Sequence, residues 1–350
     1  MARLAALVIA LGLLGCTERA PSASGRLWPE ADQLFHREPR WVGGDGAYSV
    51  PLGGDRVLWL FGDSFIAQGP VLDRSHSRMV RNSVALETGL DPANAFMEFH
   101  WPEVDGEPQS FVPEDGASWF WPMHGVVVGS RLLLFYERLG TPAGDPDGFQ
   151  TDGWSALVVD HPEAPISAWT PRGALLPKSS HDVILGEAAL LEEDFLYLYG
   201  TRGQRHSVYL ARVGTGAARE GDLRSLEWWT LAGWSKTDAP ESVVDFGAPE
   251  LSVHYDHHVN RYLMVHTEGY GGTTLALRAA DRPEGPWTPP RDILRPPESS
   301  EPDAFVYAGK AHPELFGADL VATYVPSSFA DVPREDEDRL YFPHFVRVSF

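Results

Sequence analysis

A unit of three short apolar runs recurs five times along the 350-residue chain, and this repeat constrains the fold more than any other feature. In each copy, a core run is preceded by one apolar run and followed by another. The core runs are VLWLFGDS (57–64), LLLFYERL (132–139), FLYLYGTR (195–202), RYLMVHTEG (261–269) and DLVATYVP (319–326). Short strands that return regularly and are separated by turns are typical of the blades of a β-propeller.

The composition and the segments between copies also favour an all-β fold. The chain has 34 glycines and 29 prolines, which interrupt helices and promote turns. Three tryptophan-bearing segments would each supply a fourth strand to a blade: SAWTP (167–171), LEWWTL (226–231) and GPWTP (285–289). We therefore predict a five-bladed β-propeller. A two-sheet sandwich is the alternative, but it does not account for the period of the repeat.

The first run of each copy carries an ionisable residue at its start. These runs are DGAYSVP (45–51), MHGVVVG (123–129), GEAALLE (186–192), PELSVHYD (249–256) and HPELFGA (312–318). The ionisable residues are Asp45, His124, Glu187, Glu250 and His312. Because the first strand of a propeller blade lines the central channel, these side chains would converge on one funnel. The alternative is that they line the channel and are hydrogen-bonded only by water.

Six fragments of the chain, in the same order, are similar to a known family. They are DGAYS…WLFGDS, RNSVAL, WFWPMHG, APELSVHYD, RPEGPWTPP and AGKAHPEL. Over residues 40–350 the chain resembles the family named domain of unknown function 4185, a relative of the five-bladed glycoside hydrolases that include the arabinanase-like family 43. The resemblance implies a five-bladed propeller with a funnel that faces a carbohydrate.

The resemblance also implies catalytic roles. Glycosidases generally use two carboxyl groups, one as acid and one as base or nucleophile. Asp45 matches the general base of the first blade, and Glu250 matches the general acid of a later blade. Glu187 matches the acidic group that tunes the pKa of the general acid. Asp182 is the alternative for that role, because Glu187 stands where an aspartate is more usual.

The two predicted reacting groups need different environments. Asp45 must be ionised to deprotonate water, whereas Glu250 needs a pKa raised by burial in order to donate a proton near neutral pH. Phe246, Pro249 and Leu251 would give Glu250 that apolar setting. The structural alternatives are an Asx-turn cap for Asp45 and a channel residue paired with an arginine for Glu250.

Further residues are predicted to bind the glycan. Asp63, at the end of the second strand, would return to the same rim as Asp45, or would cap the next loop. Trp121 offers an aromatic face to a sugar ring. Five further residues are predicted to bond hydroxyl or carboxylate groups, or a central water or ion. They are Asn82, His124, Arg202, Arg278 and His312. No metal-ligand spacing such as HExxH occurs, so we predict no metal site and no cofactor.

Charge and motifs exclude other classes. The formal net charge is -21, from 28 basic and 49 acidic side chains, and such a surface repels the phosphates of nucleic acids. The sequence has no Gly-x-Ser-x-Gly elbow, Walker loop or dinucleotide-binding glycine pattern in a suitable context, so serine hydrolysis and nucleotide chemistry have no support.

The N-terminus resembles a bacterial lipoprotein signal. Residues 1–16, MARLAALVIALGLLGC, combine Arg3, a short apolar run and a lipobox that ends at Cys16, the only cysteine of the chain. We expect Cys16 to become the lipidated first residue and to anchor the protein in the cell envelope, at the outer membrane or exported. A cysteine that stands there by chance is the alternative. Residues 17–39 would form a tether and lead-in, and residues 40–350 the propeller domain.

These observations predict a glycoside hydrolase that acts on an extracellular or envelope glycan, such as an arabinan, by carboxylate acid–base hydrolysis. The alternatives are a propeller that binds a glycan or an envelope partner without catalysis, and an interaction scaffold with an inert channel.

Overall fold

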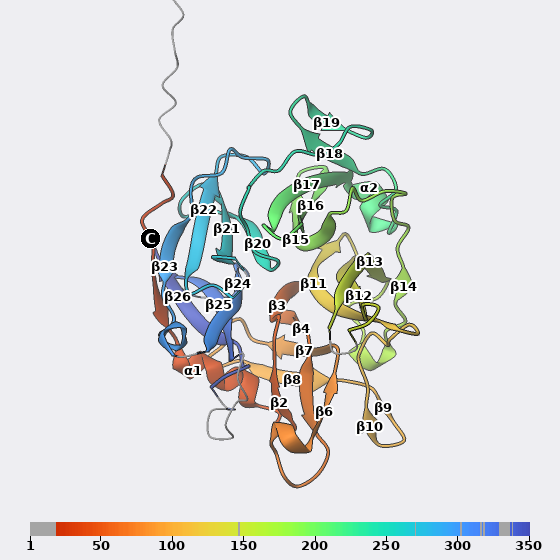
Figure 1. Cartoon of the computed structure of the whole chain (residues 1–350), viewed down its shortest axis with the longest axis vertical. Helices are drawn as coiled ribbons and strands as arrows, with labels where there is room; N and C mark the ends of the chain where they lie inside the picture. Colours follow the sequence, from red (N-terminus) through yellow and green to blue (C-terminus); the bar gives the residue numbers. More distant parts are fainter. Residues whose placement is uncertain are drawn as a thin grey trace, which may run out of the picture.

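The computed structural model describes most of the chain (Figure 1). The described residues are 19–145, 148–269, 271–301, 303–315, 317, 319–328, 337 and 339–350. The predicted signal peptide and the predicted lipidation site, Cys16, lie outside the described residues.

Five sheets of four or five strands make up the body of the described part, and neighbouring strands in them run antiparallel. The first consists of β3 (Tyr48–Gly53), β4 (Arg56–Phe61), β7 (Ser83–Thr88) and β8 (Phe96–His100). The second consists of β11 (Ser118–Val128), β12 (Arg131–Gly140), β13 (Gln150–Val159) and β14 (Arg172–Gly173). The third consists of β15 (Ile184–Glu192), β16 (Phe195–Arg202), β17 (Ser207–Gly214), β18 (Glu227–Thr230) and β19 (Gly233–Ser235).

The fourth sheet consists of β20 (Leu251–Asp256), β21 (Arg261–Thr267), β22 (Leu275–Ala280) and β23 (Arg291–Leu294). The fifth consists of β24 (Ala304–Ala311), β25 (Leu320–Ser328), β26 (His344–Ser349) and the N-terminal strand β1 (Ser24–Leu27). Two small sheets are β2 (Trp41–Gly44) with β5 (Ser64–Ala67) and β6 (Ser77–Val80), and β9 (Glu103–Val104) with β10 (Glu107–Pro108). The short helices are α1 (Pro29–Asp32), η1 (Gln33–His36), η2 (Arg74–His76), η3 (Ile166–Ala168), α2 (Thr215–Arg219) and η4 (Pro297–Ser300).

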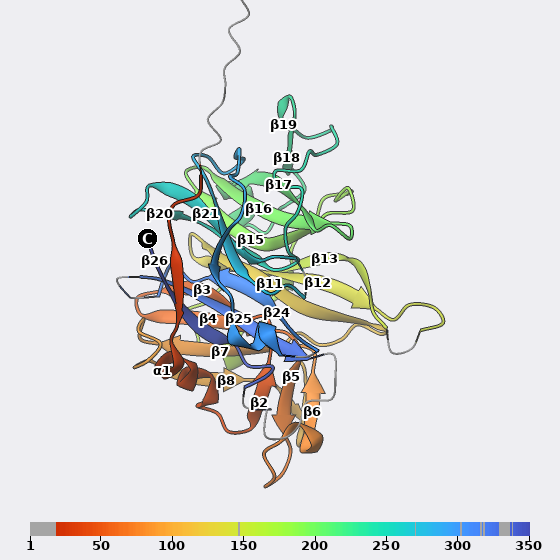
Figure 2. The ribbon, with the colours of Figure 1, turned by 60° about the vertical axis from the view of Figure 1, so that its left-hand side comes forward.

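The five sheets surround a common centre, and the first strand of each lies innermost (Figure 1). Neighbouring inner strands contact one another in the order β3, β11, β15, β20 and β24. The first and fifth sheets are joined by hydrogen bonds, since Ser49 of β3 bonds His312, which follows β24. This radial arrangement is that of a β-propeller, and the all-β prediction is confirmed. The β12–β13 hairpin and the small β2–β5–β6 sheet project from this body (Figure 2).

Hydrophobic clusters fill the seams between neighbouring sheets. Buried side chains of β4 and β12 pack together, as do those of β12 and β16, and those of β16 and β21. The series continues from β21 to β25 and returns from β25 and β26 to β4, where Trp59 and Phe345 are fully buried. The second strands are apolar on both faces because each packs against two neighbouring sheets.

Strand β1 closes the fifth sheet by pairing with the C-terminal strand β26, with Ser24 opposite Ser349 and Leu27 opposite Val346. Just after β1, Phe35 of η1 is fully buried and stacks on Phe345. Within the segment 17–39, predicted as a tether and lead-in, residues 24–27 thus pair with β26 and residues 33–36 pack into the core. Those residues complete a sheet and part of the core.

The inner strand of the fifth sheet was also predicted in the wrong place. We expected it at residues 312–318, but β24 runs from Ala304 to Ala311. A bulge between Tyr307 and Lys310, with Ala308 at φ 56°, breaks the alternation that marks a strand. The tryptophan segments 167–171 and 285–289 do not form strands either, since the fourth strands are β14 and β23.

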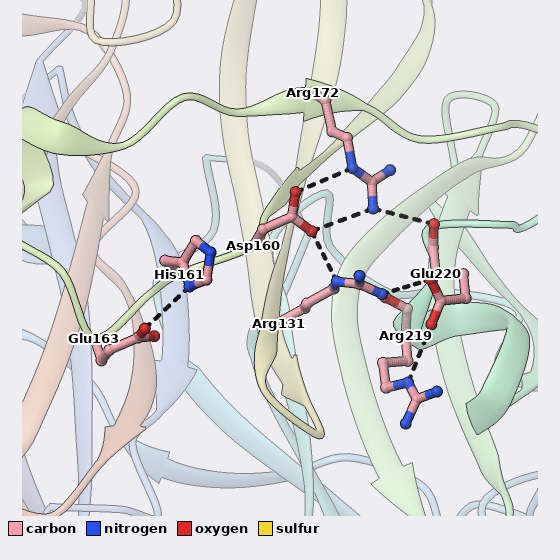
Figure 3. Close-up of polar contacts among 7 residues, drawn as sticks. All are labelled: Arg131, Asp160, His161, Glu163, Arg172, Arg219 and Glu220. Atoms are coloured by element: carbon pink, nitrogen blue, oxygen red, sulfur yellow. Dashed lines mark hydrogen bonds and ion pairs between the residues drawn. The ribbon is translucent and has the colours of Figure 1, made fainter.

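A network of ion pairs joins the second sheet to the end of α2, which lies between β17 and β18 of the third sheet (Figure 3). Arg131 pairs with Asp160 at 2.7 Å and with Glu220 at 2.6 Å. Arg172 reaches the other oxygen of Asp160 at 3.4 Å, and Arg219 reaches Glu220 at 3.2 Å. We call these five residues the arginine network. Each of its two acids has two arginine partners.

Candidate active site

Irregular backbone interrupts three of the five inner strands, and the other two begin close to an acid. The ladders of β11, β15 and β24 are interrupted at Pro122–Gly125, Leu185–Ala188 and Tyr307–Lys310. Strands β3 and β20 begin shortly after Asp45 and directly after Glu250. Bulges redirect side chains, and here they aim polar groups from several sheets at one mouth of the channel.

Two adjoining cavities occupy this mouth. The Asp45 cavity, of about 280 Å³, is lined by Asp45, Tyr48, Trp121, Glu250 and Tyr307 among others. The Glu187 cavity, of about 600 Å³, is lined by Asp152, Asp182, Glu187, Thr201 and Arg202 among others. Both are lined by Glu137, Thr151, His206 and Pro249, which form their common wall. The structure thus brings the three predicted catalytic acids, Asp45, Glu187 and Glu250, to the same mouth.

Asp45 is held by two tyrosines and by a tight backbone turn. The hydroxyl groups of Tyr307 and Tyr341 donate to Oδ2 at 2.8 and 3.1 Å. Gly62 packs against Oδ1 so closely that a Cβ there would clash with it. Burial, and then the charge of Glu250, raises the pKa of Asp45 to about 7, against the effect of the two hydroxyls and of Lys310. A base with this pKa is poised to accept a proton near neutral pH.

Lys310 links Asp45 to Glu250. Its side chain is almost fully buried, and its ammonium lies 3.6 Å from Glu250 Oε1 and 4.1 Å from the ring centre of Tyr48. The ammonium donates to the carbonyl oxygens of Gly46 and of Ala308, the latter at 2.8 Å. Lys310 therefore fixes the turn after Asp45 and sets the field at Glu250. Burial raises the pKa of Glu250, and the Lys310 charge opposes that rise.

Glu187 is the most enclosed of the three acids, with 3% of its surface exposed. Its Oε1 accepts a 2.6 Å hydrogen bond from Thr201, and its buried Oε2 has no hydrogen-bond partner among the residues described. Burial raises the pKa of Glu187 well above its usual range. Asp182, the alternative, is exposed and lines the same cavity, so the structure brings both residues to this site.

Sequence reasoning missed Glu137, Tyr48 and Lys310. Glu137 lies on β12 opposite Trp121 and accepts a 2.5 Å hydrogen bond from Thr151. The signal was present in LLLFYERL, where Glu137 follows the apolar part of the second strand. Asp63 likewise follows the apolar strand β4. Tyr48 is 2% exposed and lines the Asp45 cavity, and its hydroxyl has no partner among the described residues.

Asp63 and Trp121 hold each other beside the Asp45 cavity. The indole nitrogen of Trp121 donates to Asp63 at 2.8 Å, and Arg81 donates to the other oxygen at 3.1 Å. Trp121 lines the cavity and packs edge-on against Phe149 at 4.9 Å. Burial and the charge of Asp45 raise the pKa of Asp63 to about 7. Asp63 thus positions Trp121 from the rim.

His124 and His312 lie away from the two cavities. His124 lines a third cavity, of about 390 Å³, formed by later residues of the inner strands and so nearer the opposite mouth. Its Nδ1 accepts from the Ala189 amide at 3.0 Å. His312 is fully buried between Ser49 and Thr323, which it bonds at 2.6 and 2.8 Å. The expectation that His312 sits level with Asp45 was wrong because the strand precedes it.

Of three other predicted binding residues, two lie outside both cavities and hydrogen-bond neighbouring parts of the protein. The side-chain amide of Asn82 forms hydrogen bonds with the backbone of Val112 and Phe120. Asn82 lines neither cavity. Arg278 donates to His266 and to the carbonyl groups of Thr288 and Phe246, outside both cavities. Arg202 does line the Glu187 cavity, and its interactions are described below.

Among the residues that the structure describes, no group of three or more His, Cys, Asp or Glu side chains is arranged to hold a metal ion. Within the same described ranges, no helix is long and apolar enough to cross a membrane.

The fold is that of a β-propeller, and one mouth of its central channel holds a site lined by acidic residues. The chain belongs to the family described as Domain of unknown function (DUF5005), whose profile matches residues 30–349. The resemblance to domain of unknown function 4185 therefore named the wrong family. A search of curated proteins gives no significant match to this chain.

Solved structures share the fold at low sequence identity. A Bacteroides ovatus protein described as a candidate hydrolase superposes with a TM-score of 0.72 at 18% identity, covering 96% of this chain and 93% of that one. A Xanthomonas citri GH43_1 enzyme with xylotriose gives 0.48 at 15% identity, covering 92% of each chain. A Phanerochaete chrysosporium exo-β-1,3-galactanase with galactose gives 0.49 at 11% identity, covering 87% of this chain and 60% of that one. The first of these similarities shows a shared fold alone. The other two are too weak to indicate a function.

Proposed function

We propose that this protein is a glycoside hydrolase whose five principal sheets are the blades of a five-bladed propeller. The observation that carries the proposal is the pair Asp45 and Glu250, which line one cavity at the mouth of the channel. A lectin needs hydrogen bonds and stacking surfaces but no matched carboxyl groups whose pKa values are both raised by burial.

In this proposal Asp45 is the general base and Glu250 the general acid. Asp45 has a pKa of about 7, so its ionised fraction accepts a proton from water near neutral pH. Burial raises the pKa of Glu250, which is the direction that a donor of a proton to the leaving oxygen needs. Glu187 is the nearby acid that we propose tunes Glu250, and the charge of Glu250 in turn raises the pKa of Glu187.

The walls of the Asp45 cavity support a glycan as the ligand. Trp121 and Phe149 present aromatic surface at the cavity, and 56% of Phe149 is exposed. Sugar rings stack on such surfaces through their apolar faces. The buried hydroxyl of Tyr48, which has no partner among the described residues, offers a hydrogen bond to a sugar hydroxyl. For the Asp45 cavity itself we propose a neutral, hydroxyl-rich sugar residue, such as the arabinose unit of an arabinan, as the first candidate ligand.

We also propose that the protein is anchored in the cell envelope through lipid on Cys16. The support is the sequence LLGC at the end of a short apolar run that follows Arg3. Metabolic labelling with a palmitate analogue tests this, because Cys16→Ser should abolish the incorporation of label.

The test of the activity is a screen of the purified protein against arabinan, xylan, β-1,3-galactan and bacterial envelope glycans. Release of sugars from at least one of them is expected, with strong loss in Asp45→Asn and Glu250→Gln. Release that both variants leave unchanged would refute the assignment of the residues. Binding of a glycan with no release would instead favour a propeller that binds without catalysis.

A further inference from the structure

The Glu187 cavity has more acidic groups than acid–base hydrolysis needs. Glu137, Asp152, Asp182 and Glu187 all line it. Asp152 and Asp182 are exposed, Glu137 is half-buried, and Glu187 is buried. The acids therefore extend from the entrance of the cavity to its interior.

Among the described residues that line this cavity, Arg202 is the only permanent cation, and both of its terminal nitrogens donate to protein groups. It donates to the carbonyl oxygen of His181 at 3.0 Å and to the hydroxyl of Tyr209 at 2.6 Å. Its guanidinium also lies 4.3 Å from the ring centre of Tyr209. Burial lowers the pKa of His206, the other basic lining group, which favours its neutral form. The local charge of the cavity is therefore negative.

Glu187 adds an independent sign that a ligand binds here. It is 3% exposed, and its buried Oε2 has no hydrogen-bond partner in the part of the chain that the structure describes, although Oε1 is bonded to Thr201. A buried carboxyl oxygen without a partner costs free energy, and a donor from a ligand would remove that cost.

We propose that the Glu187 cavity is a subsite for the protonated amine of an amino sugar whose nitrogen is not acetylated. An ammonium group carries three donors and one positive charge, so it can satisfy Glu187 Oε2 and be attracted by Asp152 and Asp182. The same charges repel uronic acids and sulfated or phosphorylated sugars. This subsite deepens the proposed function, on which it rests, by naming the class of sugar beside the reacting pair.

The size and position of the cavity agree with this role. Its volume of about 600 Å³ lies within the range of small-molecule sites. It shares Glu137, Thr151, His206 and Pro249 with the Asp45 cavity, so one oligosaccharide can occupy both. A metal ion is not supported as the ligand, because no suitable group of three ligands exists among the described residues.

Isothermal titration calorimetry of the full chain tests this subsite without requiring hydrolysis. The probes are a glucosamine tetramer, its fully N-acetylated counterpart, and a galacturonic acid tetramer. We expect the amine form to bind about tenfold more tightly than the acetylated form, because it gains charge-assisted hydrogen bonds. Raising the salt concentration should reduce the difference. Equal affinity for the two forms, or tighter binding of the uronic acid, would overturn the proposal.

A pair of charge variants localises the effect. Asp152→Asn combined with Asp182→Asn should remove most of the preference for the amine. Asp292→Asn, an exposed site on β23 of the fourth sheet, should keep it. Equal loss in both proteins would attribute the preference to overall charge and overturn the subsite. If no glycan is cleaved but the amine preference is present and localised, the hydrolase proposal fails while the subsite remains.

Discussion

The arginine network and the mouth of the channel both gather acidic side chains from more than one sheet, but they treat the charges differently. In the network, Asp160 and Glu220 each have two arginine partners and remain partly exposed (Figure 3). Hydrogen bonds from Arg172 lower the pKa of Asp160, and those from Arg131 lower that of Glu220. At the mouth, burial raises the pKa of Asp45 and Glu250, and the buried ammonium of Lys310, 3.6 Å from Glu250, opposes both shifts.

The comparison shows what distinguishes a brace from a reactive site in this fold. An acid whose carboxylate is held in the ionised form by arginines does not exchange a proton near neutral pH. The arginine network can therefore hold surfaces together, but it is not suited to acid–base chemistry. An acid whose pKa is raised toward neutrality can exchange protons, at a cost in stability. Burial of the acids, together with the cations beside each of them, therefore separates the two regions.

The largest expected effect comes from Glu250→Gln, which removes the proposed proton donor. We expect the rate on a natural glycan to fall by about 10²–10⁴-fold, the usual share of general acid–base catalysis. Aryl glycosides with an acidic phenol as leaving group need little protonation, so their hydrolysis should fall much less. Steady-state kinetics on both substrate types measure this split, and an equal loss on both would contradict the role of Glu250 as acid.

Glu87 extends the comparison to stability. It is fully buried, it accepts a 2.6 Å hydrogen bond from Trp59, and burial raises its pKa from 4.5 to about 8. The folded state then binds the proton more tightly than the unfolded state. The stabilisation is fully present below pH 4.5 and is lost as pH rises through about 8.

Glu87→Gln keeps the acceptor for Trp59 but cannot ionise. We expect the free energy of unfolding of the parent to decline by on the order of a few kcal/mol across this range relative to the variant. Urea denaturation at several pH values measures the difference, with Asp292→Asn as the exposed control. Parallel pH dependence in the parent and Glu87→Gln would show that Glu87 titrates normally.

Lys310→Met tests how the buried ammonium beside Glu250 affects the pKa values at the mouth. Removing the ammonium should raise the pKa of both Asp45 and Glu250, because Lys310 lowers both. Activity requires ionised Asp45 and protonated Glu250, so both limbs of the pH–rate profile should move upward, by roughly one pH unit. A profile that keeps its position and only loses height would indicate that Lys310 is merely structural.

The smallest effect is expected in the arginine network. Arg131→Met leaves Arg172 on Asp160 and Arg219 on Glu220. We expect only a small loss of stability, which decreases with added salt, because the pairs are solvent-exposed. Thermal unfolding at two salt concentrations measures it. A larger loss that salt does not reduce would mean that the network is energetically buried.

Local patterns in the sequence predicted the second and third strands of every sheet, because these strands alternate or are continuously apolar. The run FLYLYGTR coincides with β16, and RYLMVHTEG contains β21. The inner strand β24 escaped because its bulge interrupts the alternation that pattern reading depends on. The closing strand β1 escaped because its partner, β26, lies at the opposite end of the chain.

The candidate site was predictable only where an acid stood at the start of an inner strand. Asp45, Glu187 and Glu250 were found in that way. Lys310 was missed because a lysine in AGKAHPEL reads as a solvent residue, and its burial arises from three sheets meeting around it. Asn82 shows the converse, since a residue that looks free to bind a sugar is used up by the backbone of a neighbouring loop.

The most direct test of the central claim compares the same chemical change in the two regions. Asp45→Asn and Asp160→Asn each neutralise one aspartate, and both proteins are assayed on the glycan that the parent cleaves. We predict a loss of at least about a hundredfold for Asp45→Asn and near-parental activity for Asp160→Asn. Similar activities in the two variants, whether high or low, would contradict the claim that the acids at the channel mouth carry the chemistry.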